Sequence, residues 1–197
     1  MAVQPRRHRD DRLHRRGLMA RPVRLTAQAL AVAVVVGLLA LLIWRVAHQD
    51  TSTVSKALDD GHHPAAPTFD LARLDGRGRI NLASLRGQKP LVLDFWASWC
   101  TPCIHESKRL EAAMKNYGDR VTFIGVDTKD FSADARNWQR QHGITYPSVH
   151  DGGGKVLAKW GGLPIPRIFF VARSGKVVGE LIVEEDLPRY LRQIAES

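Results

Sequence analysis

The chain of 197 residues has room for one ordinary domain and additional segments, and its 44% hydrophobic and 25% charged residues are typical of a protein with an apolar core. A formal net charge of +9 would suit a nucleic-acid-binding protein, but much of this charge comes from eight arginines in residues 1–24, where only two aspartates oppose them. Because no later stretch interleaves basic with aromatic side chains, the sequence argues against nucleic-acid binding.

A charge-free apolar run over residues 25–44 follows this basic tail. Twenty helical residues rise about 30 Å, which matches the hydrocarbon core of a bilayer, and Trp44 is typical of the membrane interface. Arginine-rich flanks remain in the cytoplasm, so we predict a cell-membrane protein that crosses once and places the rest of the chain outside. A cleaved signal peptide is the alternative. Arg45, two residues before Ala47, makes a poor cleavage site, because a small residue is expected at its position.

Residues 45–66 read as a flexible linker, because they are polar, contain Pro and Gly, and lack an apolar period. His62 and His63 are adjacent within this segment. Side chains next to each other in a flexible chain point in different directions, so we interpret the two histidines as solvated and not as metal ligands.

Residues 67–197 alternate strand and helix signals and are expected to form one domain. The strands are expected as a hairpin over 69–87, singly at 90–97 and 121–127, and as a pair over 167–183. The helices are expected over 104–118, 133–143 and 187–194, the first two ending at glycine and the last with Pro188 in its first turn. This order predicts an α/β fold with a mixed sheet.

Both cysteines lie in the stretch WCTPC, between the expected strand 90–97 and the following helix. We expect Cys100 at the helix N-terminus, where backbone N–H groups and the helix dipole stabilise the thiolate that attacks disulfides. Cys103 lies one turn later and can attack a mixed disulfide on Cys100, while Pro102 suits the first turn. The spacing therefore predicts a nucleophile and a resolving thiol that work without a further cofactor.

Three other uses of the cysteines are less well supported. A structural disulfide that closes so small a loop would stabilise little. A zinc site needs a second pair of ligands at suitable spacing, and covalent haem attachment needs a histidine directly after Cys103, where Ile104 stands.

The stretch VLDFWASWCTPC resembles the thioredoxin superfamily, and its surroundings are similar to membrane-anchored thiol–disulfide oxidoreductases of the TlpA/ResA type. The similarity covers residues 66–197 and includes HGITYPSVHDGGG and LPIPRIFFVARSGKVV. It implies a thioredoxin-like fold with an N-terminal strand pair. It also implies an enzyme that reduces disulfides of partner proteins, for example in cytochrome c maturation, with electrons from a membrane thiol donor.

The resemblance also assigns residues that bind the partner. Pro166, followed by RIFFV, matches the cis-proline that faces the disulfide in this superfamily, with Pro164 as a second candidate. Ile165 would offer its backbone to the bound partner. The remaining contacts implied by the resemblance are beside the cysteines, at Trp99, Thr101 and Pro102.

Two acidic residues are candidates for proton transfer. Asp94 stands in an otherwise apolar strand, where desolvation raises its pKa and suits it to exchange a proton with Cys103. It matches the buried aspartate of thioredoxin, whereas many relatives of the anchored type have a neutral residue there. Glu106 matches an acidic position of ResA-like reductases, and a solvated helix glutamate is the alternative.

Two further classes of function fit the sequence less well. The lead-in is similar to that of peroxiredoxins, but Ala97 stands where their T-x-x-C pattern has threonine. A non-catalytic redox-sensing or copper-binding module is the other alternative, although copper chaperones on this fold space their cysteines one residue wider and add a distal histidine.

Overall fold

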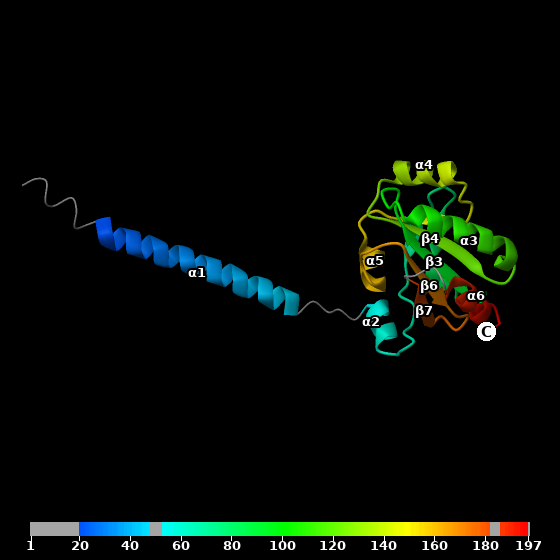
Figure 1. The fold of residues 1–197 in the computed structure, drawn as a ribbon, viewed down its shortest axis with the longest axis horizontal. Helices are drawn as coiled ribbons and strands as arrows, with labels where there is room; N and C mark the ends of the chain where they lie inside the picture. Colours follow the sequence, from blue (N-terminus) through cyan, green and yellow to red (C-terminus); the bar gives the residue numbers. More distant parts are fainter. Residues whose placement is uncertain (1–19, 48–52, 182–185, 197) are drawn as a thin grey trace, which may run out of the picture. The chain divides into compact units, whose positions relative to one another are not determined.

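The computed structural model describes residues 20–47, 53–181 and 186–196, and the chain divides into two units at residues 50 and 51. In the first unit, α1 (Ala20–Ala47) is one continuous helix (Figure 1). It has 28 residues, and its side chains over 28–44 are all exposed. Within the described part of the chain, no helix meets the length and apolarity that a membrane crossing requires. Residues 1–19 of the expected basic tail lie outside the described residues.

The second unit is built on a mixed sheet of five strands in the order β5-β4-β3-β6-β7. The strands are β3 (Leu91–Trp96), β4 (Thr122–Thr128), β5 (Ser148–Asp151), β6 (Arg167–Val171) and β7 (Val177–Leu181). β3, β4 and β5 run parallel, whereas β6 and β7 are each antiparallel to their neighbour. The expected mixed sheet is confirmed. Every residue of β3, its central strand, is buried.

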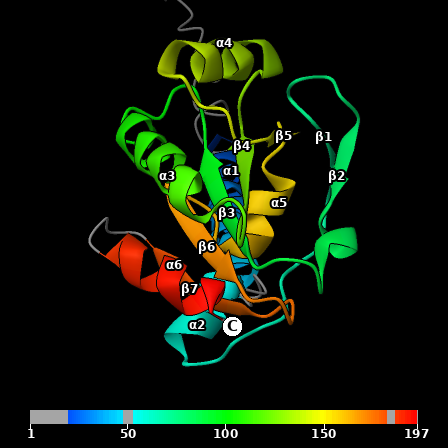
Figure 2. The ribbon, with the colours of Figure 1, turned by 90° about the vertical axis from the view of Figure 1, so that its right-hand side faces the viewer.

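Four of the helices described in this unit follow β3 in the chain. They are α3 (Cys103–Tyr117), α4 (Ser132–His142), α5 (Lys155–Trp160) and α6 (Leu187–Ala195). Figure 2 shows α3 and α6 on one face of the sheet and α5 on the other. The expected stop at Gly143 is confirmed, because this residue has the left-handed φ of 69° that glycine adopts without steric cost.

A hairpin forms a separate two-stranded sheet from β1 (Asp70–Ala72) and β2 (Arg79–Asn81), followed by the 3-10 helix η1 (Leu82–Leu85). The turn is closed by Asp75, whose Oδ1 accepts a hydrogen bond from Arg77 N at 2.9 Å. Beyond β1, Leu74 N donates to Ser148 O at 2.8 Å, which attaches the hairpin to the edge of β5. The strand-pair extension implied by the sequence is therefore present.

The structure corrects the interpretation of residues 53–66 as part of a flexible linker, while residues 48–52 of that segment lie outside the described residues. From residue 53 onwards the chain packs on the domain through a short helix, α2 (Val54–Asp59), in which Val54 is 3% exposed. Ser55 Oγ donates to Trp160 O at 2.9 Å and accepts from Arg167 Nη1 at 2.6 Å. Six residues are too few to show an apolar period, which is why the sequence pattern missed this helix.

We predict that truncating the buried Val54 side chain destabilises the domain, although the sequence pattern of this segment is that of a linker. Val54→Ala removes two buried carbon atoms and leaves a small cavity, so the free energy of unfolding should fall by about 1–2 kcal/mol. Lys56→Ala is the control, because its ion pair with Asp60 is exposed and should contribute less than about 0.5 kcal/mol. Denaturant unfolding of both variants measures the difference, and equal midpoints would show that α2 contributes no packing.

Candidate functional site

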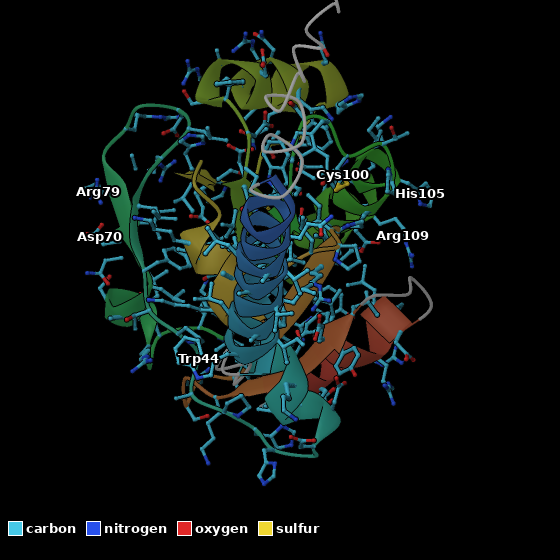
Figure 3. All side chains as sticks on the ribbon, turned by 90° about the vertical axis from the view of Figure 1, so that its left-hand side faces the viewer. Trp44, Asp70, Arg79, Cys100, His105 and Arg109 are labelled. Carbon is cyan, nitrogen blue, oxygen red and sulfur yellow. A yellow bond between two sulfur atoms is a disulfide. The ribbon has the colours of Figure 1, made fainter. Side chains whose placement is uncertain are left out.

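The two cysteines form a disulfide at the carboxyl end of β3, with sulfur atoms 2.02 Å apart and Cα atoms 5.4 Å apart. α3 begins at Cys103, and Cys100 lies in the preceding turn, where its carbonyl accepts from Cys103 N at 3.2 Å. The expectation that Cys100 begins the helix is therefore off by one turn, and Pro102 is the residue that precedes α3. Figure 3 shows Cys100 close to the beginning of α3, the helix that carries His105 and Arg109.

The backbone before β6 faces this disulfide. Cys100 is only 3% exposed, and its Sγ lies 3.7 Å from the carbonyl oxygen of Ile165. The bonds Leu163–Pro164 and Ile165–Pro166 are both cis, so the cis geometry expected at Pro166 is present and is shared with Pro164. The contact with Cys100 singles out the Ile165 carbonyl as the backbone group beside the reactive sulfur.

Asp94 lies in the middle of β3 and is 1% exposed. Its Oδ2 accepts hydrogen bonds from the Tyr146 hydroxyl at 2.6 Å and from Ser107 Oγ at 3.1 Å. Burial raises the pKa of this carboxyl to about 7, and the nearby charge of Glu106 adds to the increase, while the two hydroxyl donors oppose it. The direction expected from the apolar strand is confirmed.

The hydrogen bond to Ser107 places Asp94 close to Cys103. Ser107 follows Cys103 by four residues on α3, and both side chains are fully buried, so they share one helix face. Asp94 contacts that face within one helical turn of Cys103. Glu106 is also buried at 5% exposure, so its interpretation as a solvated helix glutamate is wrong.

Three of the residues expected to bind a partner are at the surface beside the disulfide, whereas Ile165 is buried at 8% exposure. Thr101 and Pro102 are exposed, and so is Trp99, whose Nε1 donates to Lys129 O at 3.0 Å. Trp96, three residues earlier, is instead fully buried and stacks on Trp138 with ring centres 4.4 Å apart.

Sequence reasoning missed two acids that support this loop from the end of β4. Asp130 accepts from Ser98 N at 2.6 Å and from Ser98 Oγ at 3.0 Å, which fixes the turn that leads to Cys100. Asp127 is fully buried, and its Oδ2 lies 2.6 Å from His150 Nδ1. Burial and the charge of Asp130 raise the Asp127 pKa to about 9. The sequence signal that could have indicated both residues is the stretch VDTKD, in which two acids stand at the end of a buried strand.

No cluster of three or more potential metal ligands occurs among the residues that the structure describes. The described site contains a disulfide, a neighbouring backbone carbonyl, and a buried carboxyl that is hydrogen-bonded to the helix carrying Cys103. Two sulfurs that can be reduced and re-formed, with a titratable group nearby, are suited to disulfide exchange.

Such a disulfide after the central strand of a mixed five-stranded sheet defines a thioredoxin-like protein. Residues 63–179 match the model of the AhpC/TSA family, and the chain belongs to this family as a TlpA/ResA/DsbE-like thiol–disulfide oxidoreductase.

Two curated relatives and one solved structure illustrate the similarity. Thiol-disulfide oxidoreductase ResA of Bacillus thuringiensis (strain Al Hakam) is 33% identical over 133 residues, which cover 66% of this chain and 76% of the relative. The thiol:disulfide interchange protein DsbE homolog of Paracoccus denitrificans (strain Pd 1222) is 28% identical over 173 residues, covering 85% and 93%. The structure of MTB dsbF in its mixed oxidized and reduced forms matches with a TM-score of 0.60 and 28% identity, over 67% of this chain and 98% of dsbF.

We predict that Asp94→Asn stabilises the oxidised protein in a pH-dependent way. A buried carboxyl with a raised pKa favours folding while it is protonated, below about pH 4, and this contribution is lost as pH rises towards 7. Asparagine stays neutral, so the variant should gain little at pH 4 and up to about 4 kcal/mol at pH 8. Denaturant unfolding across this range measures the gain, and a constant difference between the two proteins would contradict the raised pKa.

Proposed function

We propose that this oxidoreductase works as a reductase of partner-protein disulfides, with Cys100 as the nucleophile and Cys103 as the resolving thiol. The observation that carries the proposal is the position of the disulfide, with the Ile165 carbonyl on one side and the buried Asp94 behind Cys103. Cys100 precedes α3 and borders the surface loops, whereas Cys103 is fully buried within the helix. The first sulfur is thus the better placed of the two to meet a large partner.

The exchange transfers two electrons in two steps. In the reduced protein, the Cys100 thiolate attacks one sulfur of the partner disulfide, forming a mixed disulfide and releasing the other partner sulfur as a thiolate. The Cys103 thiolate then attacks Cys100 Sγ, forms the Cys100–Cys103 disulfide and releases the second partner thiol. The partner gains two electrons and two protons, and a membrane dithiol donor must reduce the enzyme again.

Asp94 accepts the proton that Cys103 must lose in the second step. Cys103 must lose its proton before it can attack, and a carboxylate that titrates near neutrality is a suitable acceptor. The hydroxyls of Tyr146 and Ser107 hold the carboxyl in place on the α3 side of the sheet. Glu106, which is buried three residues after Cys103, is a second candidate to accept this proton. Its charge also raises the pKa of Asp94.

The partner chain is proposed to bind where the disulfide meets the surface. The Ile165 carbonyl, held just before Pro166, is positioned to pair with partner backbone as its cysteine approaches Cys100. Thr101 and Pro102 are exposed on the other side of the same sulfur. By resemblance to the TlpA/ResA type, an apocytochrome c with an oxidised cysteine pair is the partner to test first.

We also propose that residues 25–44 anchor the enzyme in the cell membrane, with the catalytic domain on the outer side. The charge-free sequence between Arg24 and Arg45 supports this, together with the exposure of every described side chain over 28–44. The match with the DsbE homolog covers 85% of the chain, so it extends beyond the thioredoxin-like domain into the N-terminal part.

The two cysteines should behave differently when each is replaced. Cys103→Ser removes the resolving thiol, so mixed disulfides between Cys100 and partner proteins should accumulate and be visible on non-reducing gels. Cys100→Ser should trap few or none, because the remaining thiol of Cys103 is buried. Equal trapping by both variants would rule out the assignment of roles.

The anchor gives a separate prediction. The full chain should remain with membranes during an alkaline carbonate wash, and protease added from outside should digest its C-terminal domain. Recovery of a soluble mature form that begins near His48 would show that residues 25–44 are a cleaved signal peptide.

A further inference from the structure

Exposed apolar side chains gather around the disulfide. Outside α1, the described residues expose three large apolar side chains, which are Trp99 at 53%, Phe131 at 78% and Leu163 at 49%. Trp99 directly precedes Cys100, and Leu163 lies two residues before Ile165, whose carbonyl contacts Cys100. Phe131 follows Lys129, the residue that binds the Trp99 ring nitrogen, by two positions. All three therefore belong to the loops that border the reactive sulfur.

A basic hollow lies within this border. It has a volume of about 270 Å³ and is lined by residues that include Lys129, Lys155, Gly154 and Leu163. Two of the lining residues are lysines and none is acidic. Lys129 connects the hollow to Trp99 on one side, and Leu163 connects it to the Ile165 loop on the other, so the hollow adjoins both segments that flank Cys100.

The backbone of Lys129 is unusual. With a φ of 50° it is the one non-glycine residue in the left-handed region among those the structure describes, and this conformation is uncommon for a long side chain. Two hydrogen bonds hold it there, from Lys129 N to Asp151 O at 3.2 Å and from Trp99 Nε1 to Lys129 O at 3.0 Å. The lysine side chain lies against Gly154, where an added Cβ would approach Lys129 Cε to 2.7 Å. The fold thus places this side chain in the hollow at some conformational cost.

The lining of the hollow carries two positive side chains and no acidic one. Among the residues that the structure describes, the ion pairs involve neither Lys129 nor Lys155. The two nearby acids are engaged elsewhere, since Asp130 accepts from Ser98 and Asp151 accepts from the backbone N–H groups of residues 156 and 157. Two lysines that line one hollow, with no carboxylate in its lining, are suited to bind an anionic group.

We propose that this hollow binds an acidic side chain of the partner polypeptide, so that the enzyme favours disulfides whose cysteines are flanked by Asp or Glu. The proposal rests on the disulfide exchange proposed above and specifies which polypeptides it accepts. The exposed Trp99 and Leu163 would contact apolar parts of the same bound segment, and the two lysines would select its charge.

The test compares two peptides that differ only in charge. Each contains one cysteine in a mixed disulfide with 2-mercaptoethanol, with glutamates on both sides of the cysteine in one peptide and glutamines in the other. The reduced full chain, in a neutral detergent, is mixed with each peptide and quenched with acid, and chromatography gives the second-order rate constant. We expect the glutamate peptide to react about five-fold faster at low salt and less than two-fold faster at 0.5 M salt.

Three variants locate the preference. Lys155→Gln and Lys129→Asn, in which asparagine tolerates the left-handed backbone, should each reduce the preference, and together they should abolish it. Lys159→Gln is the matched control, because Lys159 lies on the same helix but lines a different hollow, and it should leave the preference unchanged. An equal loss in the control would show that the overall charge acts and not this hollow.

Bis(2-hydroxyethyl) disulfide, which is neutral and small, separates this inference from the proposed function. Normal reduction of this compound with equal rates for both peptides would overturn the acidic subsite and leave the exchange chemistry intact. Failure to reduce this compound or either peptide would instead contradict the proposed function itself.

Discussion

The Asp94 carboxyl is buried in the central strand of the sheet, and the rest of the site depends on how the fold accommodates it. β3 is paired on both edges, with Gly125 and Ile168 opposite Asp94, and the Asp94 side chain is 1% exposed, so the carboxyl has lost most of its hydration. The hydroxyls of Tyr146 and Ser107 replace part of the lost hydration. They do so from the face covered by α3, which places the carboxyl beside the helix that carries Cys103.

The parallel arrangement of β3, β4 and β5 explains why the other functional residues come together. Loops that leave the carboxyl ends of parallel strands meet at one edge of the sheet. β3 delivers the turn with Ser98 and Cys100, and β4 delivers Lys129 and Asp130, which bind that turn through Trp99 and Ser98. β6 is antiparallel to β3, so the segment before it, with Ile165, arrives at the same edge. The disulfide, the residues that support its loop and the proposed partner subsite therefore lie at the same edge of the sheet.

Local patterns in the sequence predicted much of this arrangement. The apolar runs predicted β3, β4 and β6, and the CxxC spacing predicted the redox-active cysteine pair. The single carboxylate in an apolar strand, Asp94, indicated a raised pKa. The pattern failed where elements are short, as for α2 with six residues and β5 with four, because such segments show no period. It also failed for contacts between distant segments, since Tyr146 lies 52 residues from Asp94 and Asp130 lies 32 from Ser98. No local signal connects those pairs, and only the strand order brings them together.

We propose that Asp94 takes the proton from Cys103 when the mixed disulfide is resolved. The single-turnover rate at which a peptide bound to Cys100 is released, followed from pH 5 to pH 9 in the natural protein and in Asp94→Asn, tests this role. We expect release in the natural protein to accelerate through a transition near pH 7, and the formation of the mixed disulfide by Cys100 to be similar in both proteins. In the variant, release should be slower at pH 7 and lack that transition. Identical release profiles for the two proteins would contradict the claim.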